Sequence, residues 1–564
     1  MDRSPSRWRL QVAGALSAAL ALGIAELLAS VVPRVSSVVV AVGAGVIDLA
    51  PPRFKDAAIS LLGTADKPAL ILGIVVLTLV FGAGLARLSA RSASLGTLGL
   101  IVFGALGVAA AARDPRGSAI AAVAVIAPAV AVGAVALIRL VRRALEADAE
   151  RASVVEGQRA SAEAEGERAS VVEGERASAA AEGERASAAD DTARESASRL
   201  SARTESTDRR AFLRLAVSVA AVAAVSAAGS RISFERRTVA ASRAAVPLPS
   251  PAQPAAPPPE GASLDVQGIS NLVTPNDDFY RIDTALATPQ VDAGDWQLRV
   301  TGMVDNPLAL TYDELLAMPQ VERYVTIACV SNEVGGNLIG NALWTGVPLR
   351  ELLERAGVQQ GATQIVGRST DGFGFTAGFP TEAAFDGREA LVAVGMNGEP
   401  LPPAHGYPAR LVVAGLYGYV SATKWLREIE LTTWEGFDGY WVPKGWAKEA
   451  PIKTQSRIDV PGRRQRSALT AGPQAIAGVA WAPNVGIVKV EVRIDRGLWA
   501  EARLAESLAK DTWRQWVYEW DAPPGEHELQ VRATDSTGYT QTEERAAPAP
   551  DGATGYHTVQ VSVS

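Results

Sequence analysis

Cysteine is almost absent from this chain, which has one, Cys329, among 564 residues. A single thiol cannot form an internal disulfide. It also cannot hold an iron–sulfur cluster or a thiolate zinc site, because both draw several ligands from the same chain. Three roles stay open for Cys329: an inert buried thiol, a nucleophile, or the single thiolate ligand of a metal that an organic cofactor carries.

Histidine is scarce as well, with only His405, His527 and His557. None lies in the apolar first half, so the helices there have no histidine to ligate a b-type haem, and we expect neither haem nor iron–sulfur cluster. His527 and His557 have no nearby cysteine or second histidine and are expected on the surface at strand ends. The chain also lacks an excess of positive charge, since its net charge of −7 argues against nucleic acid as a partner.

Long stretches without charge occur early in the chain. The run from Leu10 to Val32 contains one charged residue, Glu26, and is long enough at roughly 1.5 Å per residue to cross a hydrocarbon core of about 30 Å. We predict a transmembrane domain over residues 1–145, with four helices at about 10–32, 68–86, 92–112 and 117–138. Arginines precede the first helix, lie between the second and the third, and follow the fourth. By the positive-inside rule, these helix ends face the cytoplasm.

Two features of this region have alternative interpretations. The apolar segment Val35–Ile47 is too short to span and is expected to be interfacial or re-entrant. Glu26 is either a proton or ion site or a carboxylate paired near a helix end; we expect the second, because the other spans offer no ionisable partner. The same lack of intramembrane polar groups disfavours a transporter.

Three connecting segments follow. Residues 146–205 repeat units such as RASVVEGQ and RASAEAEGE, which lack the apolar surface for a core; a polar, partly helical spacer is expected rather than a coiled coil. Residues 206–230 pair Arg209 and Arg210 with a short alanine-rich apolar run, typical of a twin-arginine export signal that stays as a fifth span. The alternative is an ordinary membrane helix whose arginines only mark its cytoplasmic end, as the positive-inside rule predicts. Residues 231–262 are proline-rich and predict an extended spacer.

Cys329 lies where the strand-like VTIA gives way to the polar, glycine-rich VSNEVGGN, and such loops on a rigid scaffold carry sites. From about Asn276 to the C-terminus the chain resembles the sulfite oxidase family of molybdenum enzymes. The resemblance rests on blocks that occur in the family's order: NDDFYR (276–281), the cysteine loop, LWTGVPLRELLERAG (343–357), MNGEPLPPAHGYPARLVV (396–413) and YGYVSATKWL (417–426).

The resemblance implies a multidomain chain: the transmembrane helix bundle, an α+β molybdopterin-binding catalytic domain over 263–457, and an immunoglobulin-like β-sandwich over 458–564 that commonly mediates dimerisation. It implies a Mo-molybdopterin cofactor, two-electron oxygen-atom transfer, and Cys329 as the thiolate ligand of molybdenum. Arg281 is the implied cationic residue of the catalytic site. The implied cofactor-binding residues are Asn276, Phe279, Tyr280, Cys329, Ser369, His405, Arg410, Ser421, Thr423 and Lys424.

His405 and Arg410 also point to a ligand by their own chemistry. A lone histidine is usually structural, but this one lies in a glycine- and proline-rich loop, and a fixed His–Arg pair suits a phosphate. Retention of these residues with Cys329 and Lys424 argues against the remaining alternative, a non-enzymatic surface-tethered binding protein.

The chain departs from the sulfite-oxidising pattern at two places. Ser331, Asn332, Glu333 and Val334 follow the cysteine where that pattern has arginines, and Pro443 precedes the Lys-Gly-Trp triplet where it has a tyrosine, Tyr440 being the nearest. The substrate is therefore either a sulfite-like oxyanion that is oxidised or a sulfoxide-type compound that is reduced. Electrons are expected to pass to a separate carrier or quinone, and the catalytic domain is expected on the outer side of the cytoplasmic membrane.

Local patterns in the last two domains predict specific elements. Thr345–Gly357 has the apolar stripe of an amphipathic helix, Val347, Leu349, Leu352 and Leu353, with Gly357 as its stop. Ile487–Ile494 alternates apolar and charged residues as a half-buried strand does, and the same pattern recurs around Trp516, Leu529 and Val559.

Overall fold

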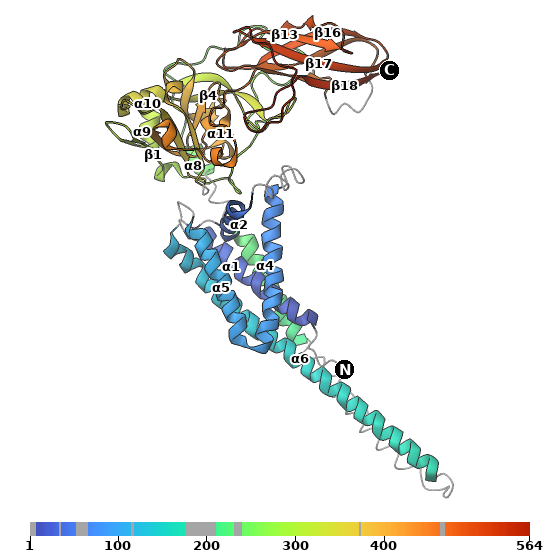
Figure 1. Cartoon of the computed structure of the whole chain (residues 1–564). Helices are drawn as coiled ribbons and strands as arrows, with labels where there is room; N and C mark the ends of the chain where they lie inside the picture. Colours follow the sequence, from blue (N-terminus) through green and yellow to red (C-terminus); the bar gives the residue numbers. More distant parts are fainter. Residues whose placement is uncertain are drawn as a thin grey trace. The chain divides into compact units, whose positions relative to one another are not determined.

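The computed structural model describes residues 7–32, 35, 37–51, 66–113, 118–175, 210–230, 240–371, 374–462 and 469–564. The chain forms two compact units, Met1–Arg237 and Thr238–Ser564 (Figure 1). The first unit is helical where it is described: α1 (Arg7–Val31), α2 (Val38–Leu49), α4 (Asp66–Arg91), α5 (Ala93–Ala112), α6 (Ala119–Glu175) and the helix Arg210–Ser230.

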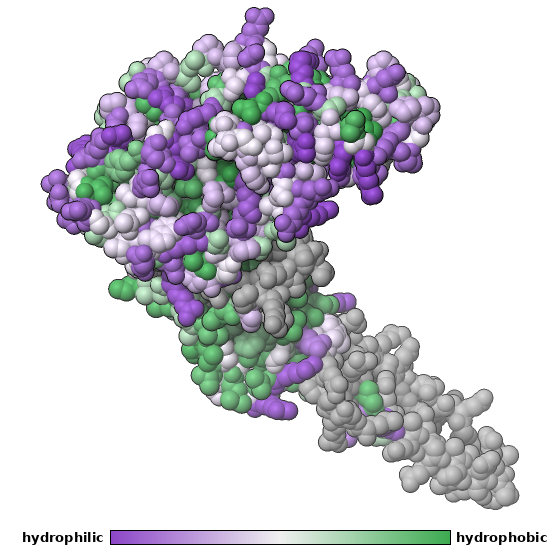
Figure 2. All heavy atoms as spheres, turned by 45° about the horizontal axis from the view of Figure 1, so that its top comes forward, coloured by the Kyte–Doolittle hydropathy of each residue, from purple (hydrophilic) through white to green (hydrophobic). Residues whose placement is uncertain are grey.

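Five of these helices are long and apolar enough to cross a membrane: α1, α4, α5, the first part of α6, and Arg210–Ser230. They coincide with the four predicted spans and the predicted fifth. Large apolar side chains such as Leu72, Leu77 and Leu106 are exposed on α4 and α5. Figure 2 shows this hydrophobic surface in green over the helices, whereas the surface of the second unit is mostly purple and white.

Small residues let two of the helices touch backbone to backbone. A Cβ atom on Gly14 of α1 would lie 2.0 Å from the carbonyl oxygen of Gly82 of α4, and one on Gly82 would lie 2.5 Å from the Cβ of Ala18. Such small-residue contacts are how membrane helices pack without a hydrophobic driving force between them.

Glu26 caps a helix, in agreement with the pairing expected for it. Its Oε1 accepts hydrogen bonds from Val39 N at 2.9 Å and from the Ser37 hydroxyl at 3.1 Å, at the start of α2. The short apolar segment is thus a helix of its own, and the carboxylate satisfies amide groups that a helix start leaves free.

The predicted spacer over 146–205 begins as a continuation of α6, which extends to Glu175. Residues 176–209, including Arg209 of the arginine pair, lie outside the described residues. The export-signal interpretation therefore stays a prediction.

The first part of the second unit consists of a mixed sheet and an antiparallel sheet with short helices. One sheet has the order β2-β1-β10-β5-β6, in which β1 and β10 are parallel; the other has the order β3-β4-β7-β8, with β9 on β7. The strands are β1 (Gln297–Gly302), β2 (Leu308–Thr311), β3 (Val321–Ala328), β4 (Ile339–Pro348), β5 (Gln364–Ser369), β6 (Thr376–Pro380), β7 (Ala390–Met396), β8 (Glu399–Pro400), β9 (Arg410–Val413) and β10 (Leu426–Thr432).

The short helices of this part are α8 (Ala240–Ala245), α9 (Tyr312–Ala317), α10 (Leu349–Ala356) and α11 (Gly418–Ser421), with 3₁₀ turns at Ala293–Asp295, Thr381–Ala384, Pro403–His405, Trp434–Gly436 and Val442–Lys444. The helix predicted over Thr345–Gly357 is shorter than expected, because Thr345–Pro348 continue β4 and pair with β7. Leu349, Leu352 and Leu353 of its buried stripe and its stop at Gly357, whose φ is 68°, are confirmed, whereas Val347 of the predicted stripe lies in β4.

The proline-rich segment is not a free spacer where the structure describes it. Ala252 N donates to the Gln320 carbonyl at 2.8 Å, and Glu322 N donates to the Gln253 carbonyl at 2.9 Å, next to the edge of β3. The expectation was wrong on this point because an extended, proline-rich chain already has the conformation that a strand edge can bind.

The C-terminal part is β-rich, with two four-stranded sheets, β11-β12-β16-β15 and β14-β13-β17-β18. The strands are β11 (Gln455–Val460), β12 (Gly472–Trp481), β13 (Ile487–Ile494), β14 (Ala500–Glu501), β15 (Arg503–Leu504), β16 (Arg514–Ala522), β17 (Gly525–Asp535) and β18 (His557–Val563). The two sheets share one hydrophobic cluster that includes Ile476, Trp516 and Leu529. The four predicted strands are confirmed.

Two expectations about this part were wrong. His527 and His557 lie at strand ends, but both are buried, because the His527 ring bonds Asp495 at 2.7 Å and the His557 ring accepts from Ile458 N at 2.9 Å. The boundary at 457/458 does not separate two independent cores either, since β11 spans it and Trp481 and Trp513 belong to the catalytic core.

Candidate functional site

Cys329 directly follows β3, at the start of an irregular loop, as predicted. Its backbone N–H donates to the Leu338 carbonyl at 2.9 Å, which closes the loop 329–338 at its base. The side chain is buried, and this burial raises the pKa of the thiol against the opposing effect of hydrogen bonds from Ser331. The thiol thus has a fixed position at the end of a strand, where it lines a cavity.

The cavity encloses about 890 Å³, including solvent at its opening. Seven of the predicted site residues line it: Phe279, Tyr280, Cys329, Ser369, His405, Arg410 and Lys424. These residues come from five separate segments of the chain. The fold thus brings together most of what the sequence blocks indicated.

Arg410, at the start of β9, is a buried cation. Only 4% of it is exposed, and burial lowers its pKa to about 10. Its guanidinium donates to the His405 carbonyl at 3.1 Å and lies over the Trp344 ring, 5.0 Å from the centroid. Among the described residues no carboxylate forms an ion pair with it, so its charge is available to an anionic ligand.

His405 lies at the end of the 3₁₀ turn Pro403–His405, with its ring packed edge-on against Phe279. Burial and the charges of Arg410 and Lys424 lower its pKa to about 4, so the ring is neutral at neutral pH. Its Nε2 lies 3.0 Å from the carbonyl oxygen of Asn276, which can only accept, so Nε2 carries the proton.

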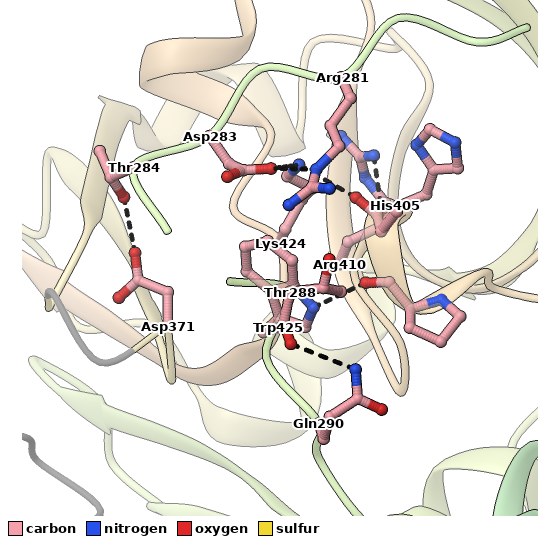
Figure 3. A network of polar contacts seen from close by, with 12 residues as sticks. Arg281, Asp283, Thr284, Thr288, Gln290, Asp371, His405, Arg410, Lys424 and Trp425 are labelled. Carbon is pink, nitrogen blue, oxygen red and sulfur yellow. Dashed lines mark hydrogen bonds and ion pairs between the residues drawn. The ribbon is translucent and has the colours of Figure 1, made fainter. Parts of the chain in front are cut away.

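Lys424 and Arg281 share one carboxylate, that of Asp283, whose side chain is 3% exposed. The Oδ2 atom of Asp283 lies 2.7 Å from Lys424 Nζ and 3.1 Å from Arg281 Nε. Figure 3 shows the Asp283 side chain turned toward both cations. Burial lowers the pKa of Lys424 to about 8, although the neighbouring carboxylate acts in the opposite direction. The positive charge of this corner is thus partly neutralised within the chain.

Four predicted residues are not among those that line the cavity: Asn276, Arg281, Ser421 and Thr423. The Asn276 amide bonds Glu399 and Asn397, and its carbonyl holds His405. The hydroxyl of Ser421 donates to the Leu416 and Tyr417 carbonyls, and that of Thr423 to the Gly367 carbonyl. The roles of these four residues toward a ligand stay predictions, because the contacts described here lie within the protein and stabilise the segments around the cavity.

Sequence reasoning missed Asp283 and the aromatic wall of the cavity. Phe375, Tyr419, Trp425, Trp441 and Trp446 line it. Tyr440, the nearest tyrosine in sequence, is not among the lining residues, whereas the Tyr419 hydroxyl donates to the Ala447 carbonyl at 2.6 Å beside Trp446. The motif YGYVSATKWL already contained Tyr419 and Trp425, but only the fold shows which rings face inward.

Comparison with known proteins places these features in a family. Residues 285–441 match the model of the oxidoreductase molybdopterin-binding domain. The chain is 35% identical over 181 residues to the uncharacterized oxidoreductase YuiH from Bacillus subtilis, covering 31% of this chain and 87% of that protein. The chain therefore belongs to the molybdopterin-binding oxidoreductases of the sulfite oxidase family.

Two further similarities extend over more of the chain. It is 29% identical over 325 residues to mitochondrial sulfite oxidase from Homo sapiens, covering 49% of this chain and 58% of the length of that relative. The crystal structure of the sulfane dehydrogenase SoxCD from Paracoccus pantotrophus matches with a TM-score of 0.47 and 27% identity, over 52% of this chain and 82% of that one.

The residues present fit a molybdopterin. A soft thiol, a buried guanidinium without a carboxylate partner among the described residues, a neutral imidazole and an ammonium converge on one cavity, and Phe279 and Tyr280 stack beside it at 5.3 Å. This set offers a thiolate to a metal, cations to a phosphate and flat apolar surface to a pterin ring.

Proposed function

We propose that this chain is a membrane-anchored, molybdopterin-dependent oxidoreductase in which Cys329 supplies the thiolate ligand of molybdenum. The observation that carries the proposal is the meeting of Cys329, His405, Arg410 and Lys424 around one cavity. The bound cofactor would supply two-electron oxygen-atom transfer. Electrons would pass to a separate carrier or quinone, with neither haem nor iron–sulfur cluster in this chain.

The residues of the chain would divide the work of holding the cofactor. Arg410 and Lys424 would bind its phosphate, and Arg410 is suited to this because it is buried and fixed by the His405 carbonyl and the Trp344 ring. Phe279 and Tyr280 would pack against the pterin, with Asn276, Ser369, Ser421 and Thr423 around it. His405 would offer only Nδ1 to the cofactor, as a hydrogen-bond acceptor, since its low pKa keeps the ring neutral and its one proton lies on Nε2.

Two substrate classes remain, and one observation separates them. A sulfite-like oxyanion needs uncompensated positive charge near the thiolate, whereas Asp283 binds both Arg281 and Lys424. Aromatic rings line much of the cavity, among them Trp441 and Trp446. We infer that reduction of a neutral, sulfoxide-type substrate is the better supported alternative. With Arg410 and Lys424 engaged by the cofactor phosphate, oxidation of an oxyanion would depend on Arg281, whose charge Asp283 partly neutralises.

The five apolar helices support membrane anchoring. With arginine-rich ends in the cytoplasm and an odd number of spans, the catalytic part would lie on the outer face of the cytoplasmic membrane. The two C-terminal sheets with their shared core support an immunoglobulin-like sandwich, and this part would mediate a homodimer.

The test is the molybdenum content of the purified full chain, measured by mass spectrometry, for wild type beside Cys329→Ser. Ala342→Ser is the matched control, because it also puts a hydroxyl into the buried core but away from the cavity. We expect stoichiometric molybdenum in wild type and control, with altered metal spectra and lost turnover in Cys329→Ser. Wild-type protein without molybdenum would overturn the proposal in favour of a binding protein.

A further inference from the structure

The cysteine loop 329–338 is braced by hydrogen bonds between its own residues. Asn332 Oδ1 accepts from Leu338 N at 2.8 Å, Asn332 N donates to the Cys329 carbonyl at 3.1 Å, and Gly336 N donates to the Glu333 carbonyl at 2.8 Å. These bonds make the loop a compact body with Cys329 at one end. Whatever holds the apex, residues 335 and 336, therefore also fixes where the thiol points.

The apex is held by an arginine from the C-terminal sheets. Arg457 of β11 donates from Nη1 to the Gly336 carbonyl at 2.7 Å and from Nη2 to the Ser270 hydroxyl at 2.7 Å. Its Nε bonds the Asp459 carboxylate at 2.6 Å, and only 8% of the residue is exposed. Because the guanidinium is planar and all three of its nitrogens are bonded, it cannot turn away from the loop.

A second residue from the same sheets packs on the apex. His557, the first residue of β18, is 1% exposed, and its Nδ1 accepts from Ile458 N at 2.9 Å. A Cβ atom on Gly335 would lie 2.1 Å from the His557 Cδ2 atom, and Gly335 has a φ of +73°. Only glycine fits this point of the loop, both for its backbone angle and for its contact with the ring.

The strand that leads to Cys329 is supported by the same part of the chain. Thr326 N, in β3, donates to the Asp511 carbonyl at 2.9 Å, and Trp513 N donates to the Thr326 hydroxyl at 2.8 Å. Strand β3 thus rests on residues beyond the predicted domain boundary, and the loop rests on Arg457, the last residue before that boundary, and on His557 beyond it.

We propose that Arg457 and His557 are positioning residues that hold the cysteine loop, so that the C-terminal sheets form part of the structure that presents Cys329 to the cavity. This proposal rests on the proposed function only for the metal that Cys329 would bind. The contacts of Arg457 and His557 with the loop lie within the chain and do not depend on that metal. Neither residue is among those that line the cavity, so their effect would reach the site only through the loop.

The single cysteine gives a direct readout. The full chain, produced in cells that make no molybdopterin, is treated with iodoacetamide, and the rate of mass increase reports Cys329 alone. We expect Arg457→Gln to raise this rate about tenfold, the effect of losing one hydrogen bond to a charged group on local opening. Gly335→Ala should raise the rate as well, because the added Cβ atom would push the loop away from the His557 ring. The same variants from molybdopterin-producing cells should retain less molybdenum.

Arg493→Gln is the matched control, because Arg493 is a half-buried arginine of the same part whose bonds go to Gln530 and Glu543. Its labelling rate should equal that of wild type. Arg457→Lys should give an intermediate rate, and it carries the test if Arg457→Gln does not fold. Rates equal to wild type in all loop variants, or an equal rise in Arg493→Gln, would overturn the proposal. Absence of molybdenum from wild type would instead refute the proposed function and leave the labelling result standing.

Discussion

Arginines lie in two different settings in the second unit. On β13 and β17, Arg493 and Arg532 flank the Trp499 ring at 4.6 and 4.3 Å, and each has a carboxylate partner, Glu543 and Glu491. Arg410 also lies over a tryptophan, but it is buried and its bonds go to carbonyl oxygens. The C-terminal sheets balance their charges within the chain, whereas the cavity leaves a buried charge to be balanced by a ligand.

The largest effect is expected from Arg410→Met. The loss of a buried, charge-assisted contact should lower retained molybdenum by roughly 10- to 100-fold. Thermal stability of the cofactor-free chain should not fall, because the substitution removes a buried charge that lacks a carboxylate partner. Mass spectrometry and thermal unfolding measure the two outcomes. Full molybdenum content in Arg410→Met would contradict the idea that a ligand balances the charge of Arg410.

The second prediction concerns pH. The pKa of His405 is lowered to about 4 in the folded chain, from its ordinary value of 6.5, because the ring is buried. The unfolded chain therefore binds this proton first, and stability is lost as pH falls below 6.5, by about 2 kcal/mol at pH 5. Thermal unfolding of the cofactor-free chain at pH 7 and pH 5 should show a smaller loss for His405→Gln than for wild type. An identical pH dependence in the two proteins would show that this ring is accessible to protons.

Asp283→Asn tests how far charge in the cavity corner sets the substrate. Removal of the carboxylate frees the charges of Arg281 and Lys424, so KM for sulfite should fall about fivefold, while KM for dimethyl sulfoxide should hardly change. Asp295→Asn is the control, since Asp295 is an exposed aspartate of the same part. An equal change for both substrates would assign Asp283 to cofactor binding instead.

The smallest effect is expected on the sheet face. Arg493→Met removes a surface ion pair and a ring contact, which together contribute less than about 1 kcal/mol. Molybdenum content and turnover should stay at the wild-type level. A large loss of either in this variant would remove the distinction between the two settings of arginine.

Local patterns in the sequence predicted the elements whose cause is local. Apolar runs without charge predicted the long helices, because a helix that crosses a membrane needs about 20 consecutive apolar residues, and this is visible in the composition of the segment. Period-two alternation predicted β13, β16, β17 and β18. The helix over 345–357 was overestimated, because the pairing of Thr345–Pro348 with β7 depends on residues far away in sequence.

The chain's own sequence determined the class of chemistry: one cysteine after a strand, a histidine and an arginine in a glycine-rich loop, and the family blocks around them. Tertiary structure alone decided that Asp283 neutralises two cations, that Tyr419 rather than Tyr440 faces the cavity, and that Arg457 and His557 support the cysteine loop. These contacts join residues up to 222 positions apart (557 − 335). Side-chain type sets what a group can do, whereas its charge balance and its neighbours arise only when distant segments pack together.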